Sequence, residues 1–336
     1  MELALTGAAF LIGAICAGLM GFAIQRGATC TVAAMDEVVR KRTFTRLGSM
    51  VEASLWVLGG LLIAQAFHAL AQMPAGYAVT WTTILGGALL GIGAFVNGAC
   101  VFGAIARLGS GEWAYVVTPI GFFAGCLIAG AIGIIPAPQK LAFGSPVLHA
   151  SMWLAAVFVI AMIWRVGRAL HDARAASRSG HMATALRHAL TQHVWSPRGA
   201  TTVIGVTFFF MLVLTGAWTY TDVLAELARG MATNLPARVL LVFALLAGAM
   251  IGGWTAGRFR NTPVTLAQVA KCFVGGALMG LGSLMIPGGN DGLILVGMPL
   301  AWPYAWLTFL TMCVTIGAAQ WTQKALAMQS REQAVH

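Results

Sequence analysis

The sequence predicts an all-α membrane protein with about nine transmembrane helices, an inverted repeat and short re-entrant half-helices. Of its 336 residues, 59% are hydrophobic and only 9% are charged. A soluble domain of this length needs more charged residues than that, because its surface faces water. Apolar runs of about 20 residues recur along the chain, and each is long enough to span a bilayer core of about 30 Å.

The expected crossings follow one another and are separated by turns that are polar or rich in glycine and proline. They cover residues 3–24, 48–70, 77–96, 113–135, 148–164, 201–218, 239–256, 264–286 and 304–321. The first run lacks a basic segment before it and a small-residue cleavage site after it, so we expect a retained span rather than a signal peptide. Polar or glycine-rich breaks follow three of the crossings, at 25–30, 97–98 and 287–291, and a short apolar segment follows each break. We expect residues 99–106 to form a half-helix.

Two glycine blocks with the same spacing organise this pattern. One block, Gly86–Gly93, lies in the third crossing, and the other, Gly275–Gly282, lies in the eighth. The blocks are five crossings apart, and an odd number makes them point in opposite directions. We therefore expect two inverted membrane repeats, residues 1–147 and 201–336, joined by the fifth crossing and a basic loop in residues 148–200. Matched breaks in the two halves indicate a transport site near the bilayer midplane.

The net charge of +10 is concentrated in two segments, residues 36–46 and 165–198. The positive-inside rule places both in the cytoplasm, with the N-terminus in the periplasm and the C-terminus in the cytoplasm. This charge pattern points to a lipid bilayer and not to nucleic acid as the partner. Residues 169–191 could form an amphipathic surface helix, whereas residues 219–236 are expected to be polar and external. Four histidines of the second basic segment are interpreted as part of a solvated linker and not as a metal site: His171, His181, His188 and His193.

Two of the six cysteines stand at the breaks. Cys30 follows the break after the first crossing, and Cys100 follows Asn97 and Gly98 at the start of the expected half-helix. Unpaired backbone N–H groups and the positive end of a helix dipole gather at such a start and suit an anion. A thiol adds a weak S–H donor and a polarisable sulfur. The alternative is that both are small buried hydrophobic residues, as free cysteines usually are.

Other polar residues at the breaks are also candidates for the substrate path. Asn97, Asn290 and Asp291 could bind a substrate, or they could cap the neighbouring helix ends. Gly288 and Gly289 belong to the break at residues 287–291. Arg26, in the break at residues 25–30, could attract an anion or anchor the membrane surface. The cysteines form no CxxC pair, so we expect no zinc site, disulfide framework or cofactor.

Several of these motifs together resemble the YeeE/YedE family. They are Gly21–Cys30, Gly91 to Cys100, Gly109–Trp113 and Gly275 to Asn290. The resemblance implies an inner-membrane permease, an hourglass-shaped helical fold and the uptake of thiosulfate. It also implies that three cysteines line the path, of which Cys30 and Cys100 match the first two. The third does not match, because Gly289 stands at its position and Asp291 follows. A cytoplasmic sulfur-carrier protein commonly accompanies the family.

The favoured hypothesis is therefore a permease for thiosulfate or a related sulfur-containing anion, and not an enzyme. A change of substrate to another sulfur or selenium compound stays open because of Gly289. A membrane sulfur-transfer or redox protein that carries a persulfide on Cys30 or Cys100 also stays open. A metal-ion channel is disfavoured because the breaks lack clusters of histidine, methionine or acids. The chain has no GxxxxGK loop, so it is not expected to hydrolyse ATP.

Overall fold

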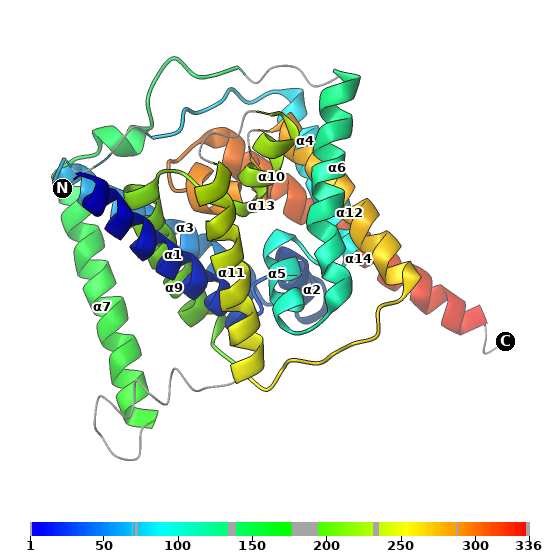
Figure 1. Cartoon of the computed structure of the whole chain (residues 1–336). Helices are drawn as coiled ribbons and strands as arrows, with labels where there is room; N and C mark the ends of the chain where they lie inside the picture. The colour runs from blue at the N-terminus through cyan, green and yellow to red at the C-terminus, as the bar shows by residue number, and fades with distance from the viewer. Residues whose placement is uncertain are drawn as a thin grey trace.

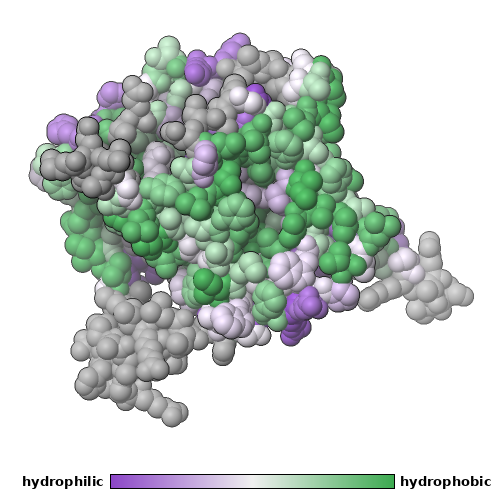
Figure 2. All heavy atoms as spheres, viewed as in Figure 1, coloured by the Kyte–Doolittle hydropathy of each residue, from purple (hydrophilic) through white to green (hydrophobic). Residues whose placement is uncertain are grey.

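The structure, a computed structural model, describes residues 2–68, 70, 73–133, 139–176, 194–230, 235–286 and 288–333, and helices make up most of them (Figure 1). Within these ranges the only β feature is an isolated antiparallel bridge between Tyr77 and Lys140. By length and composition, seven helices could cross a membrane: Gly7–Lys41, Thr45–Ala66, Trp81–Gly109, Trp113–Ile132, Pro197–Thr215, Leu235–Thr255 and Leu266–Met285. The face in Figure 2 is hydrophobic over most of its height, with hydrophilic residues toward its upper and lower edges.

All nine expected crossings fall on helices. The helices are α1 (Glu2–Gly27), α2 (Thr31–Lys41), α3 (Thr45–Ala66), α4 (Trp81–Asn97), α5 (Val101–Gly109), α6 (Val117–Ile132), α7 (Met152–Ala176), α9 (Pro197–Thr215), α10 (Tyr220–Ala228), α11 (Leu235–Thr255), α12 (Leu266–Met285), α13 (Asn290–Gly292) and α14 (Pro303–Gln333). A π-helix, Leu293–Gly297, continues α13. The helices at the fifth and ninth expected crossings, α7 and α14, are not among the seven that could cross a membrane.

Two segments that the sequence predicts to be loops contain helix instead. In the expected external loop, α10 forms because Thr219 accepts a hydrogen bond from the N–H of Asp222, and Tyr220 and Val223 are buried. In the first basic segment, α2 continues to Lys41. Local charge pairing on that helix, described below, favours its continuation. Of the second basic segment, residues 177–193 lie outside the described residues, and with them His181, His188, His193 and most of the expected amphipathic helix.

The two glycine blocks pack against each other, and this contact joins α4 to α12. A Cβ on Gly86 would lie 2.9 Å from the carbonyl oxygen of Gly282, and a Cβ on Gly93 would lie 2.7 Å from that of Gly275. The pairing of the first residue of one block with the last of the other means that the two helices run antiparallel. Backbones can approach so closely only where small residues remove the side chain between them.

The long helices form two groups, and the short helices connect them. α1 packs on α9 and α11, and α9 packs on α3; in the second group α12 packs on α4 and α6, and α4 packs on α14. Glycines again set the spacing, since Gly121 meets Phe273 and Gly125 meets Ala277 where α6 runs parallel to α12. The short helices connect the groups. α2 contacts α3 and α14, α10 contacts α6 and α11, and α5, which follows α4 in the chain, contacts α1 and α11 (Figure 1).

We predict that Gly275→Val destabilises the protein. The new Cβ would lie 2.6 Å from the backbone nitrogen of Asn97 and 2.6 Å from the oxygen of Gly93, so the two helices must separate. Overpacking of this kind costs about 1–3 kcal/mol. Thermal unfolding of the purified protein in detergent measures the loss. The matched control is Gly130→Val in α6, where a Cβ meets nothing within 4 Å. An equal loss in both variants would show that helix propensity, and not the α4–α12 contact, is responsible.

Candidate functional site

The structure brings the two candidate cysteines, Cys30 and Cys100, together at the starts of two short helices. Cys30 is the N-cap residue of α2, and Cys100 is the N-cap residue of α5. The two thiols lie beside each other, and the backbone N–H of Thr31 donates to the Sγ of Cys100 at 3.1 Å. Cys100 is fully buried. A side chain on Gly103 would collide with Cys30, whose Cβ lies 2.9 Å from the position of the missing Cβ.

The break before Cys100 is held open by Asn97 and Gly98. Gly98 has φ +73°, the left-handed region that favours glycine and ends α4. The Asn97 amide nitrogen donates to the carbonyl oxygen of Ala99 at 2.7 Å, and its amide oxygen accepts from the hydroxyl of Thr118 at 3.0 Å. The hydroxyl of Tyr115 donates to the Asn97 carbonyl at 3.1 Å. The Asn97 side chain therefore fixes the geometry of the break.

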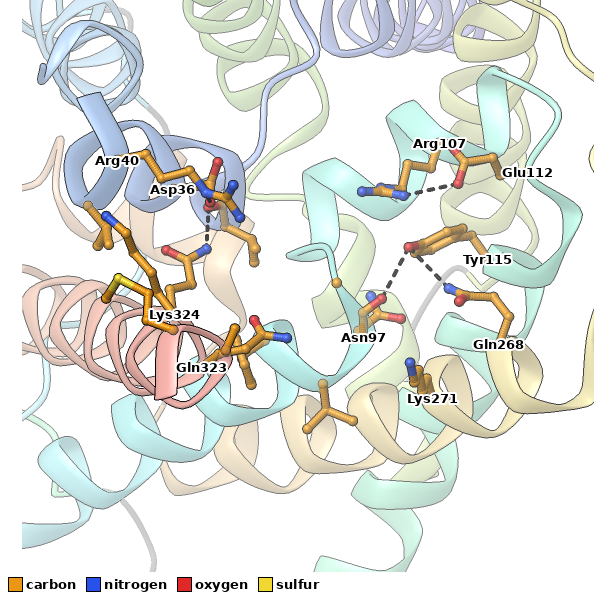
Figure 3. A pocket seen from close by; sticks show the side chains of 18 residues that line it. Asp36, Arg40, Asn97, Arg107, Glu112, Tyr115, Gln268, Lys271, Gln323 and Lys324 are labelled. Carbon is orange, nitrogen blue, oxygen red and sulfur yellow. Dashed lines mark hydrogen bonds and ion pairs between the residues drawn. The ribbon is translucent and has the colours of Figure 1, made fainter. Parts of the chain in front are cut away.

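A large cavity with many charged and polar side chains in its wall, which we call the vestibule, reaches this break (Figure 3). Its volume is about 1240 Å³, and Asn97 and Gly98 form part of its wall. The charged side chains that line it are Asp36, Arg40, Arg107, Glu112, Lys271 and Lys324. Arg40 pairs with Asp36 at 2.6 Å, and Arg107 pairs with Glu112 at 3.0 Å. Cys30 and Cys100 do not line the vestibule, so the thiol pair lies behind the break.

Lys271 and Lys324 were not identified from the sequence as candidates. A signal for Lys271 was present, since it lies in the second turn of α12, a helix long and apolar enough to cross a membrane. Charged residues in such helices usually face a cavity or a path. Lys324 lies on α14 beyond the expected ninth crossing, and only the fold shows that it faces the same space as Lys271 (Figure 3).

The break at residues 287–291 has the same backbone form as the break at residues 97–98 but different side chains. Gly289 is the N-cap of α13 with φ −84° and ψ −175°, close to the φ −73° and ψ −179° of Cys100. The Thr221 side chain of α10 fills the space beside Gly289, because a Cβ on Gly289 would lie 2.7 Å from the Cβ of Thr221 and closer to its hydroxyl. Gly288 has φ +118°, which only glycine adopts readily.

Asp291 is buried at this break and its carboxylate is well supplied with donors. It accepts the backbone N–H of Thr221 at 3.1 Å, the backbone N–H of Gly292 at 3.0 Å and the hydroxyl of Thr221. Asn290 is completely buried, and neither its amide nitrogen nor its amide oxygen has a hydrogen-bond partner among the described residues. A buried amide without partners points to an unseen water or ligand, because leaving such a group unpaired costs about 1–3 kcal/mol.

Two small cavities lie near the breaks. One, of about 10 Å³, is lined by Phe102 and Ile105 of α5 and by Asp291, together with residues of the surrounding helices. Another of about 10 Å³ lies beside Cys30 and is also lined by Arg46. Each has room for about one water molecule. Neither cavity is large enough to hold a larger ion.

The remaining candidate residue, Arg26, is held by contacts with neighbouring side chains. Arg26 is buried, donates from Nη2 to the hydroxyl of Thr255 at 2.9 Å and lies 4.9 Å from the ring centre of Phe22. The other four cysteines are buried within helices: Cys16, Cys126, Cys272 and Cys313. Within the described part of the chain, no group of three or more His, Cys, Asp or Glu side chains is placed to hold a metal ion.

Comparison with known proteins agrees with the membrane fold and the YeeE/YedE resemblance. Residues 26–318 match the family model described as Sulphur transport. The thiosulfate transporter TsuA of Escherichia coli (strain K12) is 25% identical, over 93% of this chain and 94% of its own length. The thiosulfate transporter TsuA of Spirochaeta thermophila is also 25% identical, over 86% of this chain and 91% of its own. Both relatives are named as transporters and not as enzymes. This chain is therefore a multi-span membrane protein that belongs to the Sulphur transport family.

Proposed function

We propose that this protein is a permease for thiosulfate or a related sulfur-containing anion. The observation that carries the proposal is the meeting of two short helices at two neighbouring thiols, the half-buried Cys30 and the fully buried Cys100, with a backbone N–H directed at the sulfur of Cys100. The relatives that match nearly the whole chain are named thiosulfate transporters, which supports the same substrate here.

The thiol pair suits such an ion for electrostatic reasons. Backbone N–H groups at the starts of α2 and α5 supply donors and partial positive charge without a full cation that would hold the ion too tightly. Each S–H group is a weak donor, and its sulfur is polarisable. A sulfur anion that meets several weak contacts can both enter and leave, as conduction requires. Gly103 is needed because its missing side chain leaves room for Cys30.

Nine crossings in an inverted, hourglass-like arrangement are part of this proposal. The antiparallel contact of α4 with α12 and the parallel contact of α6 with α12 agree with the order of the crossings. Each of three contacts also has a counterpart in which the two halves are exchanged. The contact of α1 with α11 corresponds to that of α9 with α3, and the contact of α6 with α12 corresponds to that of α14 with α4. The contact of α2 with α14 corresponds in the same way to that of α10 with α6. A total of nine crossings requires that α7 and α14 are the fifth and ninth. The two repeats are then residues 1–147 and 201–336.

We further propose that the vestibule faces the cytoplasm of a bacterial cell. It opens at the end of the bundle where the basic segment of residues 36–46 lies, and basic segments favour the cytoplasmic side. The N-terminus then lies in the periplasm and the C-terminus in the cytoplasm. A cytoplasmic sulfur-carrier protein could collect the ion at this end. In the other half, the unpartnered amide of Asn290 is a candidate contact for the arriving ion, together with Gly288, Gly289 and Asp291.

The contact between the thiols also favours a second candidate, in which sulfur is transferred covalently. In this reaction the thiolate of Cys30 or Cys100 would attack the outer sulfur of thiosulfate, break its S–S bond, form a persulfide and release sulfite. The transport of an intact ion and this transfer differ in their products. Mass spectrometry of the two cysteines after turnover, with labelled sulfite as the second readout, separates them. A selenium oxyanion that competes with labelled thiosulfate would instead favour a broader substrate.

We predict that Cys100→Ala abolishes thiosulfate uptake. The substitution removes the S–H donor and the sulfur that accepts from Thr31, while the backbone of the break stays in place. The measurement is uptake of sulfur-labelled thiosulfate into cells that lack their own sulfate and thiosulfate importers. Cys313→Ala, at a buried cysteine inside α14 and not at a helix break, is the matched control and should keep uptake. Full uptake by Cys100→Ala, at an equal amount of protein in the membrane, would count against a role for the thiol.

We predict that Gly289→Cys is tolerated only when Thr221 is also replaced. The new side chain would collide with Thr221, whereas the double variant Thr221→Gly/Gly289→Cys leaves room for a thiol at the position equivalent to Cys100. The amount of folded protein, measured by fluorescence-detected gel filtration, should fall in the single variant and recover in the double one. Gly130→Cys is the control for an added thiol. Normal amounts of Gly289→Cys would contradict the packing of Thr221 against Gly289.

A further inference from the structure

We propose that the vestibule contains a second anion site, in which Lys271 and Lys324 bind a small, doubly charged sulfur oxyanion such as thiosulfate or sulfate. This inference rests on the proposed function, because it assigns a station on the same path. It names residues outside the thiol pair and the two glycine breaks, and it predicts binding that does not need Cys100.

The first argument is the charge balance of the cavity wall. Four cationic and two anionic side chains line the vestibule. Both carboxylates are already engaged, Asp36 by Arg40 and Glu112 by Arg107. No ion pair of Lys271 or Lys324 is found among the described residues. The vestibule therefore carries two positive charges in excess, which match the charge of a sulfur dianion.

The second argument is the shape of the wall and the source of its polar groups. The two lysines come from different helices, α12 and α14, and in Figure 3 their side chains lie on opposite sides of Asn97. Glutamine amides accompany them, Gln268 one turn before Lys271 and Gln323 next to Lys324. Lysine carries a mobile ammonium group on a flexible stem, so two lysines can follow an ion that moves within the cavity.

The third argument is the position of the charges relative to the path. A concave wall with a net charge focuses the field and raises the local concentration of oppositely charged ions. The vestibule ends at Asn97 and Gly98, and Cys100 follows directly behind them. An ion at the lysines is therefore next to the break. It could be an imported ion that is leaving or an oxyanion already present on the same side of the membrane.

The test is equilibrium binding of labelled thiosulfate and labelled sulfate to the purified, full-length protein at low salt. We expect Lys271→Gln/Lys324→Gln to weaken binding of the ion by roughly three- to tenfold, the effect of two partly exposed charges. The matched control is Lys41→Gln, an exposed lysine of α2 that does not line the vestibule. The charge-preserving double variant Lys271→Arg/Lys324→Arg should retain most of the binding and serves as the control for folding.

The outcomes separate this inference from the proposed function. Binding that persists in Cys100→Ala but falls in Lys271→Gln/Lys324→Gln supports the vestibule site even if uptake fails. If thiosulfate and sulfate compete for the site, it is a binding site for the substrate as it leaves. If only sulfate binds, the site serves an oxyanion that enters from the vestibule side. Unchanged binding in Lys271→Gln/Lys324→Gln, or an equal loss in Lys41→Gln, would overturn the proposal.

Discussion

The close approach of the α4 and α12 backbones is the contact on which the rest of the site depends. Gly86 and Gly93 lie against Gly282 and Gly275, and no side chain separates the two helices. This contact holds α4 against α12 up to the residues where Gly98 ends α4, and the hydrogen bonds of Asn97 then direct the chain into α5 with Cys100 at its start. In lipid the packing of small residues replaces the hydrophobic effect as the force that joins helices. The same contact therefore stabilises the fold and positions the thiol.

The two halves share a backbone design but differ in the groups that they place at the breaks. One half presents the thiols of Cys30 and Cys100, which are soft and uncharged. At the equivalent position of the other half, Gly289 leaves space that Thr221 fills, and Asp291 accepts the Thr221 hydroxyl. On the proposed path, an anion would meet weak donors at Cys30 and Cys100. At the break of residues 287–291 it would meet a buried carboxylate beside an amide that has no hydrogen-bond partner among the described residues. This difference, and not the shared fold, is where we expect the choice of substrate to be made.

Much of this arrangement could be predicted from the sequence, because apolar runs and glycine spacing are local signals. The glycine blocks, the break at Asn97 and the placement of Cys30 and Cys100 before short helices follow from residues close in the chain. The helix α10 was missed because its polar residues suggested a loop, although Thr219 and Asp222 form an N-terminal cap. The packing of Thr221 against Gly289, and the shared cavity of Lys271 and Lys324, could not be predicted, since each joins residues far apart in the chain.

Protection of the thiols by substrate tests the central claim most directly. A protein in which Cys100 is the only remaining cysteine would be treated with N-ethylmaleimide in the presence of thiosulfate, or of chloride at equal ionic strength. Our account predicts that thiosulfate slows labelling of Cys100, whereas labelling of a Cys313-only protein does not change. Equal labelling rates of Cys100 with and without thiosulfate, at concentrations that saturate uptake, would contradict the passage of the ion past the thiol pair.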